Sequence, residues 1–184
     1  MLPRNPSTFL QLFTNSFILS DDAKRFAIAR EIERGKDNAY LKNGFIMPTG
    51  ILIGYLFCRF VNKKVMLFRR PPFIRFVMYG MVAPLVTFIA VFLEDVNKYN
   101  IEGTLDNRTC NLGISYAKGG VEYYDKQLKR HIALRSLMPQ NRAKNIYNIQ
   151  GDLWPSFTRG YKYRPITQRK QHCMKILNHF QNNV

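Results

Sequence analysis

Two apolar segments, separated by a short basic stretch, stand out from an otherwise polar chain. The longer one, residues 76–93, contains eighteen residues without a charge, and the shorter one covers residues 44–58. A helix needs about 20 mostly apolar residues to span a bilayer. The pattern therefore predicts a mainly α-helical membrane protein, built on a two-helix transmembrane hairpin over residues 40–93, with spans at about 40–60 and 76–93.

The two predicted spans differ in how strongly they favour the bilayer. Residues 76–93 hold ten Leu, Ile, Val or Phe side chains, which contribute roughly −3 to −6 kcal/mol on the insertion scale. The first segment holds seven such side chains, worth about −2 to −4 kcal/mol. Its helix must extend toward Tyr40 and Phe60, and the side chains of Lys42 and Arg59 near its ends would then reach toward the lipid head groups. Two buried helices of a soluble core are the alternative.

Small residues recur at helical spacing in both predicted spans. Such residues let helix backbones approach closely, although glycine is also generally common in membrane helices. We predict that these faces pack on each other and on neighbouring subunits. The candidate packing residues are Gly50, Gly54, Gly80, Ala83 and Thr87.

The stretch between the predicted spans is basic and contains no acid. Under the positive-inside rule this loop belongs on the matrix side, which places both termini in the intermembrane space. Residues 24–43 also carry six basic residues, so the first helix by itself favours neither orientation. The loop is suited to an anionic phospholipid such as cardiolipin, or its charges only set the topology. The candidate head-group ligands are Arg59, Lys63, Lys64, Arg69, Arg70 and Arg75.

The hairpin separates two polar arms. In the N-terminal arm, residues 1–39, acids near residue 21 and an apolar stripe up to residue 32 predict one amphipathic surface helix. In the C-terminal arm, residues 94–184, we predict helices near 122–138 and 167–181.

The rest of the C-terminal arm reads as irregular structure. Residues 101–120 are rich in turn-forming residues, which predicts a loop with a brief strand near 112–117. Residues 154–165 alternate basic and aromatic side chains and are expected to lie extended on a neighbour. So few apolar stripes predict an extended, partly helical basic arm without an independent globular core, ordered by a larger assembly.

The distribution of charge along the chain indicates which compartment and which partners to expect. The chain has 28 Lys and Arg against 12 Asp and Glu, and from residue 127 onward it has 11 basic residues and one acid. Such a tail favours an acidic protein, phospholipid or RNA. The first nineteen residues contain one Arg and no acid, which is closer to a mitochondrial targeting segment than to a secretory signal. We therefore expect a multi-pass protein of the mitochondrial inner membrane.

Residues that carry chemistry are sparse. Cys58 is expected to be a packing residue, whereas Cys110 and Cys173 could form a disulfide if their arm faces the intermembrane space. The three histidines lack zinc-ligand spacing, and the sequence contains no phosphate-binding, zinc-protease or nucleophile-elbow motif. The sequence thus predicts no catalytic, cofactor-binding or metal-binding residue, and no bound group other than a phospholipid.

These patterns favour a non-catalytic accessory subunit of a mitochondrial inner-membrane respiratory-chain complex or ATP synthase. The expected partners are other subunits of that complex and membrane lipid, whereas nucleic acid is disfavoured. A membrane anchor of an RNA-containing machine, such as a mitochondrial ribosome, is one alternative, because tyrosine-rich basic patches can stack on bases. An import or assembly factor is another.

Overall fold

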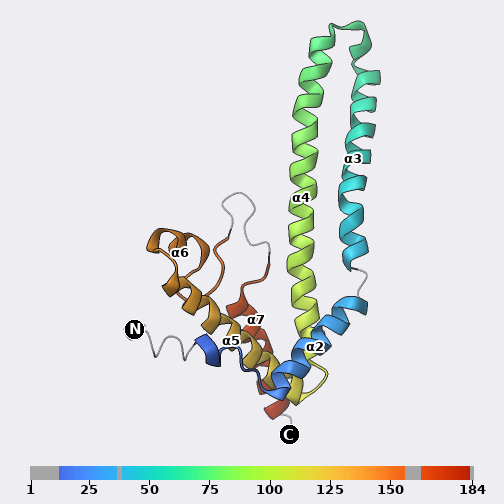
Figure 1. The fold of residues 1–184 in the computed structure, drawn as a ribbon. Coiled ribbons are helices and arrows are strands. Elements are labelled where there is room, and N and C mark those ends of the chain that lie inside the picture. Colours follow the sequence, from blue (N-terminus) through green and yellow to red (C-terminus); the bar gives the residue numbers. More distant parts are fainter. Residues whose placement is uncertain (1–12, 37–38, 156–162, 183–184) are drawn as a thin grey trace. The chain divides into compact units, whose positions relative to one another are not determined.

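The computed structural model describes residues 13–36, 39–155 and 163–182 (Figure 1). Apart from one isolated antiparallel bridge between Tyr147 and Leu153, the regular structure of these residues is helical. Residues 38–98 form one compact unit, the hairpin unit. Residues 1–37 and 99–184 form the other, the arm unit. The elements are α2 (Asp21–Lys36), α3 (Ala39–Lys64), η1 (Leu67–Arg69), α4 (Pro72–Cys110), α5 (Ile114–Leu137), α6 (Gln140–Ile146) and α7 (Ile166–Asn182).

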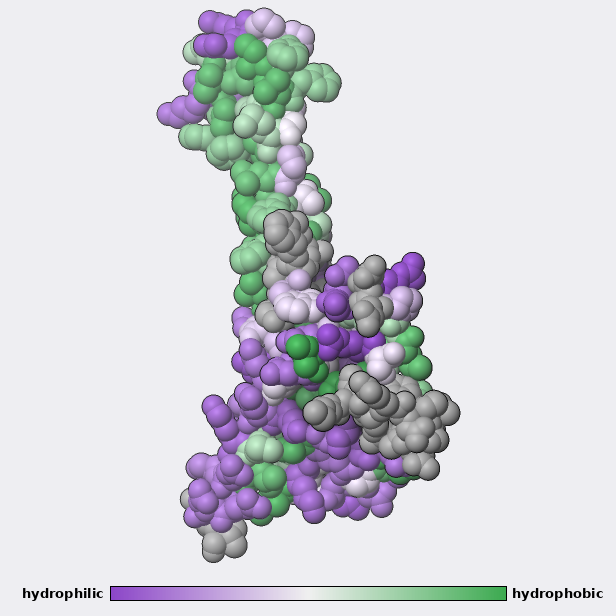
Figure 2. Space-filling view, turned by 90° about the vertical axis from the view of Figure 1, so that its left-hand side faces the viewer, coloured by the Kyte–Doolittle hydropathy of each residue, from purple (hydrophilic) through white to green (hydrophobic). Residues whose placement is uncertain are grey.

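The hairpin unit consists of α3 and the first part of α4, which lie side by side. Both helices are long and apolar enough to cross a membrane. Large apolar side chains such as Phe45, Ile51 and Phe88 are more than half exposed, and Figure 2 shows hydrophobic residues gathered along this unit. Such a surface needs lipid or other apolar helices around it.

The helices of the hairpin unit extend further than the predicted spans. Helix α3 ends at Lys64 and α4 begins at Pro72, so the basic stretch predicted as a loop is partly helical. A proline suits a helix start, because its missing N–H needs no partner there. The chain reverses around Met66, which has a left-handed backbone with φ 49°.

The predicted loop at residues 101–120 is wrong, because α4 continues to Cys110 and α5 starts at Ile114. The strand expected near 112–117 is also absent from the described structure. Composition misled the prediction, since the hydroxyls of Thr104 and Thr109 donate to carbonyls one turn earlier and fit the helix. Packing of the last turns of α4 overrides their weak helix propensity.

The core of the arm unit forms between α2, the end of α4, α5 and α7. Helix α2 crosses α5 closely at two glycines. A Cβ atom at Gly119 would collide with the backbone of Asp22, and one at Gly120 would lie 2.9 Å from the ring of Phe26. The buried cluster consists of Phe26, Cys110, Ala117, Tyr124, Leu128, Ile166 and Cys173.

The C-terminal arm does not build this core alone, because α2 of the N-terminal arm contributes to it. The helices near 122–138 and 167–181 are present as α5 and α7, but they pack with α2 from the other side of the hairpin sequence. The N-terminal helix supplies Phe26, which the C-terminal arm lacks when it is considered alone. The stretch expected to lie extended, residues 154–165, falls largely outside the described residues.

Candidate functional site

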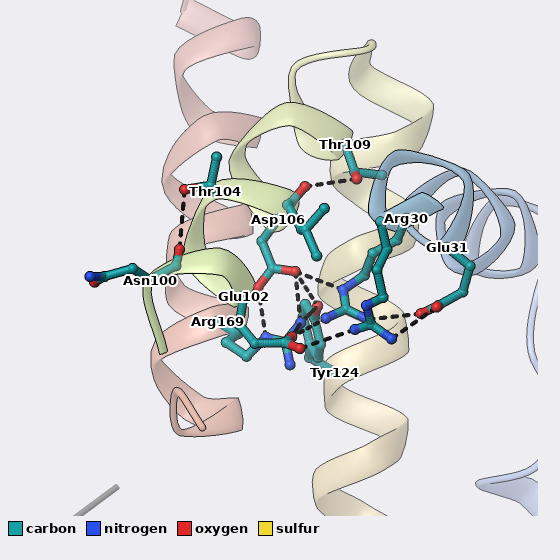
Figure 3. A network of polar contacts seen from close by, with 11 residues as sticks. Arg30, Glu31, Asn100, Glu102, Thr104, Asp106, Thr109, Tyr124 and Arg169 are labelled. Atoms are coloured by element: carbon teal, nitrogen blue, oxygen red, sulfur yellow. Dashed lines mark hydrogen bonds and ion pairs between the residues drawn. The ribbon is translucent and has the colours of Figure 1, made fainter. Parts of the chain in front are cut away.

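A buried carboxylate organises the polar interior of the arm unit. The side chain of Asp106, on α4, has no exposed surface. Its Oδ1 accepts hydrogen bonds from Arg30 Nε at 3.0 Å, from the Tyr124 hydroxyl at 2.6 Å and from an Arg169 terminal nitrogen at 2.7 Å (Figure 3). Its Oδ2 accepts from Arg169 Nε at 2.6 Å. This arrangement pairs the charge on both oxygens, as a buried carboxylate requires.

A second acid lies one helical turn earlier on α4. Glu102 pairs with Arg30, with Arg34 at 3.0 Å and with Arg169 at 2.9 Å. Glu31, which is largely exposed, pairs with Arg30 and Arg34, both on α2. Three arginines thus face three carboxylates. We call this set the ion-pair cluster, formed by Arg30, Glu31, Arg34, Glu102, Asp106, Tyr124 and Arg169.

The protonation states of Tyr124 and Arg169 are fixed around neutral pH. Burial and the adjacent Asp106 charge raise the pKa of Tyr124 well above its ordinary value, so its hydroxyl stays a donor. Burial alone would lower the pKa of Arg169, but its hydrogen bonds to Asp106 and the surrounding negative charge outweigh this and raise it. A general acid or base needs a pKa near the working pH. The tyrosine and the arginine of this cluster are therefore unsuited to that role.

The ion-pair cluster connects four helices. Arg30 comes from α2, Asp106 from α4, Tyr124 from α5 and Arg169 from α7. The Arg169 guanidinium also lies over the Tyr124 ring, 4.6 Å from its centroid. Removing the Asp106 charge would leave the buried Arg30 and Arg169 with less opposing charge, which is costlier than the pairs are stabilising. The geometry is that of a structural clamp between the helices.

The structure brings the two candidate disulfide residues together. Cys110 ends α4 and Cys173 lies in α7; both are fully buried, with their Sγ atoms 2.8 Å apart as free thiols. The third cysteine, Cys58, is half-buried and belongs to α3.

The candidate packing residues of the hairpin unit divide into two groups. Gly50 and Gly54 face α4, where a Cβ would lie 3.4 Å from the Ala90 Cβ and 3.0 Å from a Val86 methyl group, respectively. Gly80 has open space around it. The last two, Ala83 and Thr87, line a groove of about 650 Å³ between the helices, and the Thr87 hydroxyl donates to the Ala83 carbonyl.

The candidate head-group residues lie around the turn of the hairpin unit. The side chain of Arg59 lines the groove beside Asn62, whose amide donates to the Tyr79 hydroxyl at 2.7 Å. Arg75 is half-buried. Exposed side chains belong to Arg59, Lys63, Lys64, Arg69 and Arg70. Lipid binding by these residues stays a prediction.

Sequence reasoning missed the ion-pair cluster. The available signal was matched spacing, because Arg30 and Arg34 on α2 and Glu102 and Asp106 on α4 are both i, i+4 pairs. Within the described residues no group of three His, Cys, Asp or Glu side chains is placed to hold a metal ion.

Two candidate membrane helices and a separate helical unit held by buried ion pairs define a membrane-anchored α-helical protein. The comparison with known sequences agrees with this class. The chain belongs to the Transmembrane protein 177 family, whose sequence profile matches residues 6–162.

Relatives in several vertebrates are similar over most of this chain. The rat protein is 30% identical over 169 residues, covering 88% of this chain and 52% of the relative. The human protein is 30% identical over 162 residues, with 88% and 51% covered. The zebrafish protein is 29% identical over 164 residues, with 89% and 52% covered. This chain thus spans about half the length of these curated relatives, and no solved structure matches it.

Proposed function

We propose that this chain is a non-catalytic accessory protein of the mitochondrial inner membrane, and that it serves a respiratory-chain complex or ATP synthase as a stabilising subunit. The observation that carries the proposal is the hairpin unit, whose large apolar side chains are exposed along both helices. In such a protein the hairpin unit packs against lipid and core membrane subunits, and the arm unit binds their peripheral parts.

Small residues on an outward face support contact with other membrane helices. A Cβ atom placed on Gly80 would meet no atom within 4 Å. In a bilayer, helices associate through such small-residue faces, because apolar side chains gain nothing from leaving lipid. Gly80 is therefore suited to contact a neighbouring subunit.

The basic turn of the hairpin unit supports a lipid contact. Its exposed Lys and Arg side chains include Lys63, Lys64, Arg69 and Arg70, and such clusters attract anionic lipid by roughly 1 kcal/mol per charge. With the turn on the matrix side, a phospholipid such as cardiolipin is the expected ligand. The arm unit then lies in the intermembrane space.

An assembly or import factor is the second candidate. The arm unit has its own hydrophobic core and an internally paired ion-pair cluster. A unit of this kind folds without a permanent host, which suits a protein that joins its partners transiently.

The proposal is tested by solubilising native membranes in a mild detergent, separating complexes on a native gel and identifying the proteins in each slice by mass spectrometry. Co-migration with the subunits of one respiratory complex or ATP synthase supports the accessory role. Migration alone or with immature intermediates favours the assembly factor, and migration with ribosomal proteins favours an RNA-machine anchor.

A matched pair of variants links the result to the hairpin unit. Gly80→Leu places a large side chain on an open face, and Gly35→Leu does the same on α2, outside the apolar segments. We expect Gly80→Leu to reduce co-migration and Gly35→Leu to leave it unchanged.

A further inference from the structure

The end of α4 and the middle of α7 are joined by two successive side-chain contacts, which we call rungs. Asp106 and Cys110 are four residues apart on α4, and Arg169 and Cys173 are four residues apart on α7. The first rung is the Asp106–Arg169 ion pair at 2.6 Å. The second is the Cys110–Cys173 pair at 2.8 Å. Equal spacing on both helices keeps the two contacts in register.

The thiols are close enough to be joined. A disulfide S–S bond is about 2.05 Å long, so the two sulfurs need to approach by roughly 0.8 Å. The neighbourhood leaves room for this, because residue 120 is a glycine and a Cβ there would lie 3.1 Å from the Cys173 sulfur. The ion-pair rung one turn away already holds the helices at this separation.

We propose that Cys110 and Cys173 form a disulfide in the native membrane, which covalently fastens the end of α4 to α7. This inference rests on the proposed placement of the arm unit in the intermembrane space, since structural disulfides persist in oxidising compartments. The bond closes a loop that contains α5, so it restrains the helices that form the core of the arm unit.

The oxidant is a protein disulfide of a thiol–disulfide oxidoreductase. One cysteine thiolate attacks that disulfide to give a mixed disulfide, and the second cysteine then displaces the oxidoreductase sulfur. The chain loses two electrons and two protons, and the oxidoreductase is released as a dithiol. Its own disulfide breaks while the Cys110–Cys173 bond forms.

The thiol–disulfide exchange takes place while the arm unit folds. In the folded chain the hydrogen bond with Cys110, together with burial, raises the pKa of the Cys173 thiol, so little thiolate is available. The attacking species is the thiolate. The bond therefore forms before the core closes.

The test uses the full chain in freshly isolated native membranes. The membranes are denatured in excess N-ethylmaleimide, digested without reduction, and the peptides are identified by mass spectrometry. We expect a cross-linked peptide pair that contains Cys110 and Cys173, and an alkylated Cys58 as the internal control. Alkylation of both Cys110 and Cys173 overturns the inference.

Cysteine variants test which cysteines pair and whether the disulfide stabilises the arm unit. Cys110→Ser should leave Cys173 alkylated, and Cys58→Ser should leave the cross-linked pair intact. Reductant should speed proteolysis of the arm unit in the Cys58→Ser chain and have no effect on a Cys110→Ser/Cys173→Ser chain. Equal rates of proteolysis of the Cys58→Ser chain with and without reductant would contradict the proposal that the disulfide restrains the arm unit.

The outcome is independent of the native-gel test. Co-migration with a complex together with free thiols keeps the proposed accessory role and removes the disulfide. A cross-linked pair in a chain that migrates alone keeps the disulfide and removes the accessory role.

Discussion

In the arm unit the least exposed side chains include an aspartate and two arginines, whereas in the hairpin unit phenylalanine, isoleucine and leucine side chains are more than half exposed. The first unit buries charge because every buried charge of the ion-pair cluster has a partner inside the chain. The second exposes apolar surface because its partners lie outside the chain, in lipid or in other proteins. The comparison shows that the buried charges of the ion-pair cluster are matched within the chain, whereas the apolar surface of the hairpin unit is matched by nothing within the described part of it.

The largest expected effect comes from breaking the ion-pair cluster. Asp106→Asn keeps the shape of the side chain but leaves Arg30 and Arg169 buried with less opposing charge. We expect a loss of about 3–5 kcal/mol in the stability of the arm unit. Limited proteolysis reports the opened population, and at about 1.4 kcal/mol per factor of ten it should speed by roughly a hundredfold or more.

Glu31→Gln is the matched control, since this side chain is 57% exposed although it also pairs with Arg30. Its expected cost is less than about 1 kcal/mol because water screens exposed pairs. Equal proteolysis of the two variants would show that the buried pairs do not hold the arm unit together.

A steric change at the α2–α5 crossing comes next. Gly119→Val introduces a side chain that collides with the Asp22 backbone, which cannot move as easily as a side chain. Overpacking of this kind costs about 1–3 kcal/mol, and we expect the upper end. The measurement is again proteolysis of the arm unit.

Gly35→Ala controls for helix propensity, because nothing lies within 4 Å of a Cβ at that position of α2. It should be neutral or stabilising by up to about 1 kcal/mol. A Gly119→Val chain as resistant as the Gly35→Ala chain would rule out the close crossing of α2 and α5.

The packing of α3 against α4 should be weakened by a bulky substitution at Gly54 and not by one at Gly80. Gly54→Leu pushes on the Val86 side chain, with an expected cost in the lower half of roughly 1–3 kcal/mol. The readout is the oxidative cross-linking yield of a Gly50→Cys/Ala90→Cys chain, since those Cβ positions are 3.4 Å apart. Gly54→Leu should lower the yield.

Gly80→Leu should leave that yield unchanged, since its surroundings within the chain are open. A fall of similar size in both variants would mean that α3 and α4 are separated by any added bulk in either helix, and that the Gly50–Gly54 face is not what holds them.

The sequence predicted the parts of the fold that follow from local pattern. An eighteen-residue segment without charge identified the core of α4, and acids followed by an apolar stripe identified α2. Among the candidate packing residues, Gly50 and Gly54 of α3 face α4, whereas Gly80 has nothing within 4 Å of a Cβ.

The rest depends on contacts between distant residues. The core of the arm unit joins Phe26 to Tyr124, and the ion-pair cluster joins Arg30 to Asp106 across 76 positions. Arg30 on a polar helix reads as a solvated charge, and Asp106 in a turn-rich segment reads as loop. Neither is recognisable as buried until α2, α4 and α7 are placed together, which no local pattern encodes.

The smallest expected effect is a pH dependence at the rim of the arm unit. Burial raises the pKa of Asp125, but hydrogen bonds and charges from Lys129 and Lys170 outweigh it, so the pKa lies below its ordinary value of 3.8. A lowered folded-state pKa means that the contribution is fully present above the ordinary pKa and is lost as the pH falls through the folded value. The stability difference between the native chain and Asp125→Asn should therefore be constant near neutral pH and shrink below about pH 4. Because Asp125 is partly exposed, the difference should also shrink in high salt, whereas the effect of Asp106→Asn, with its buried partners, should persist. A salt response of equal size at both positions would remove the distinction between the rim and the buried ion-pair cluster.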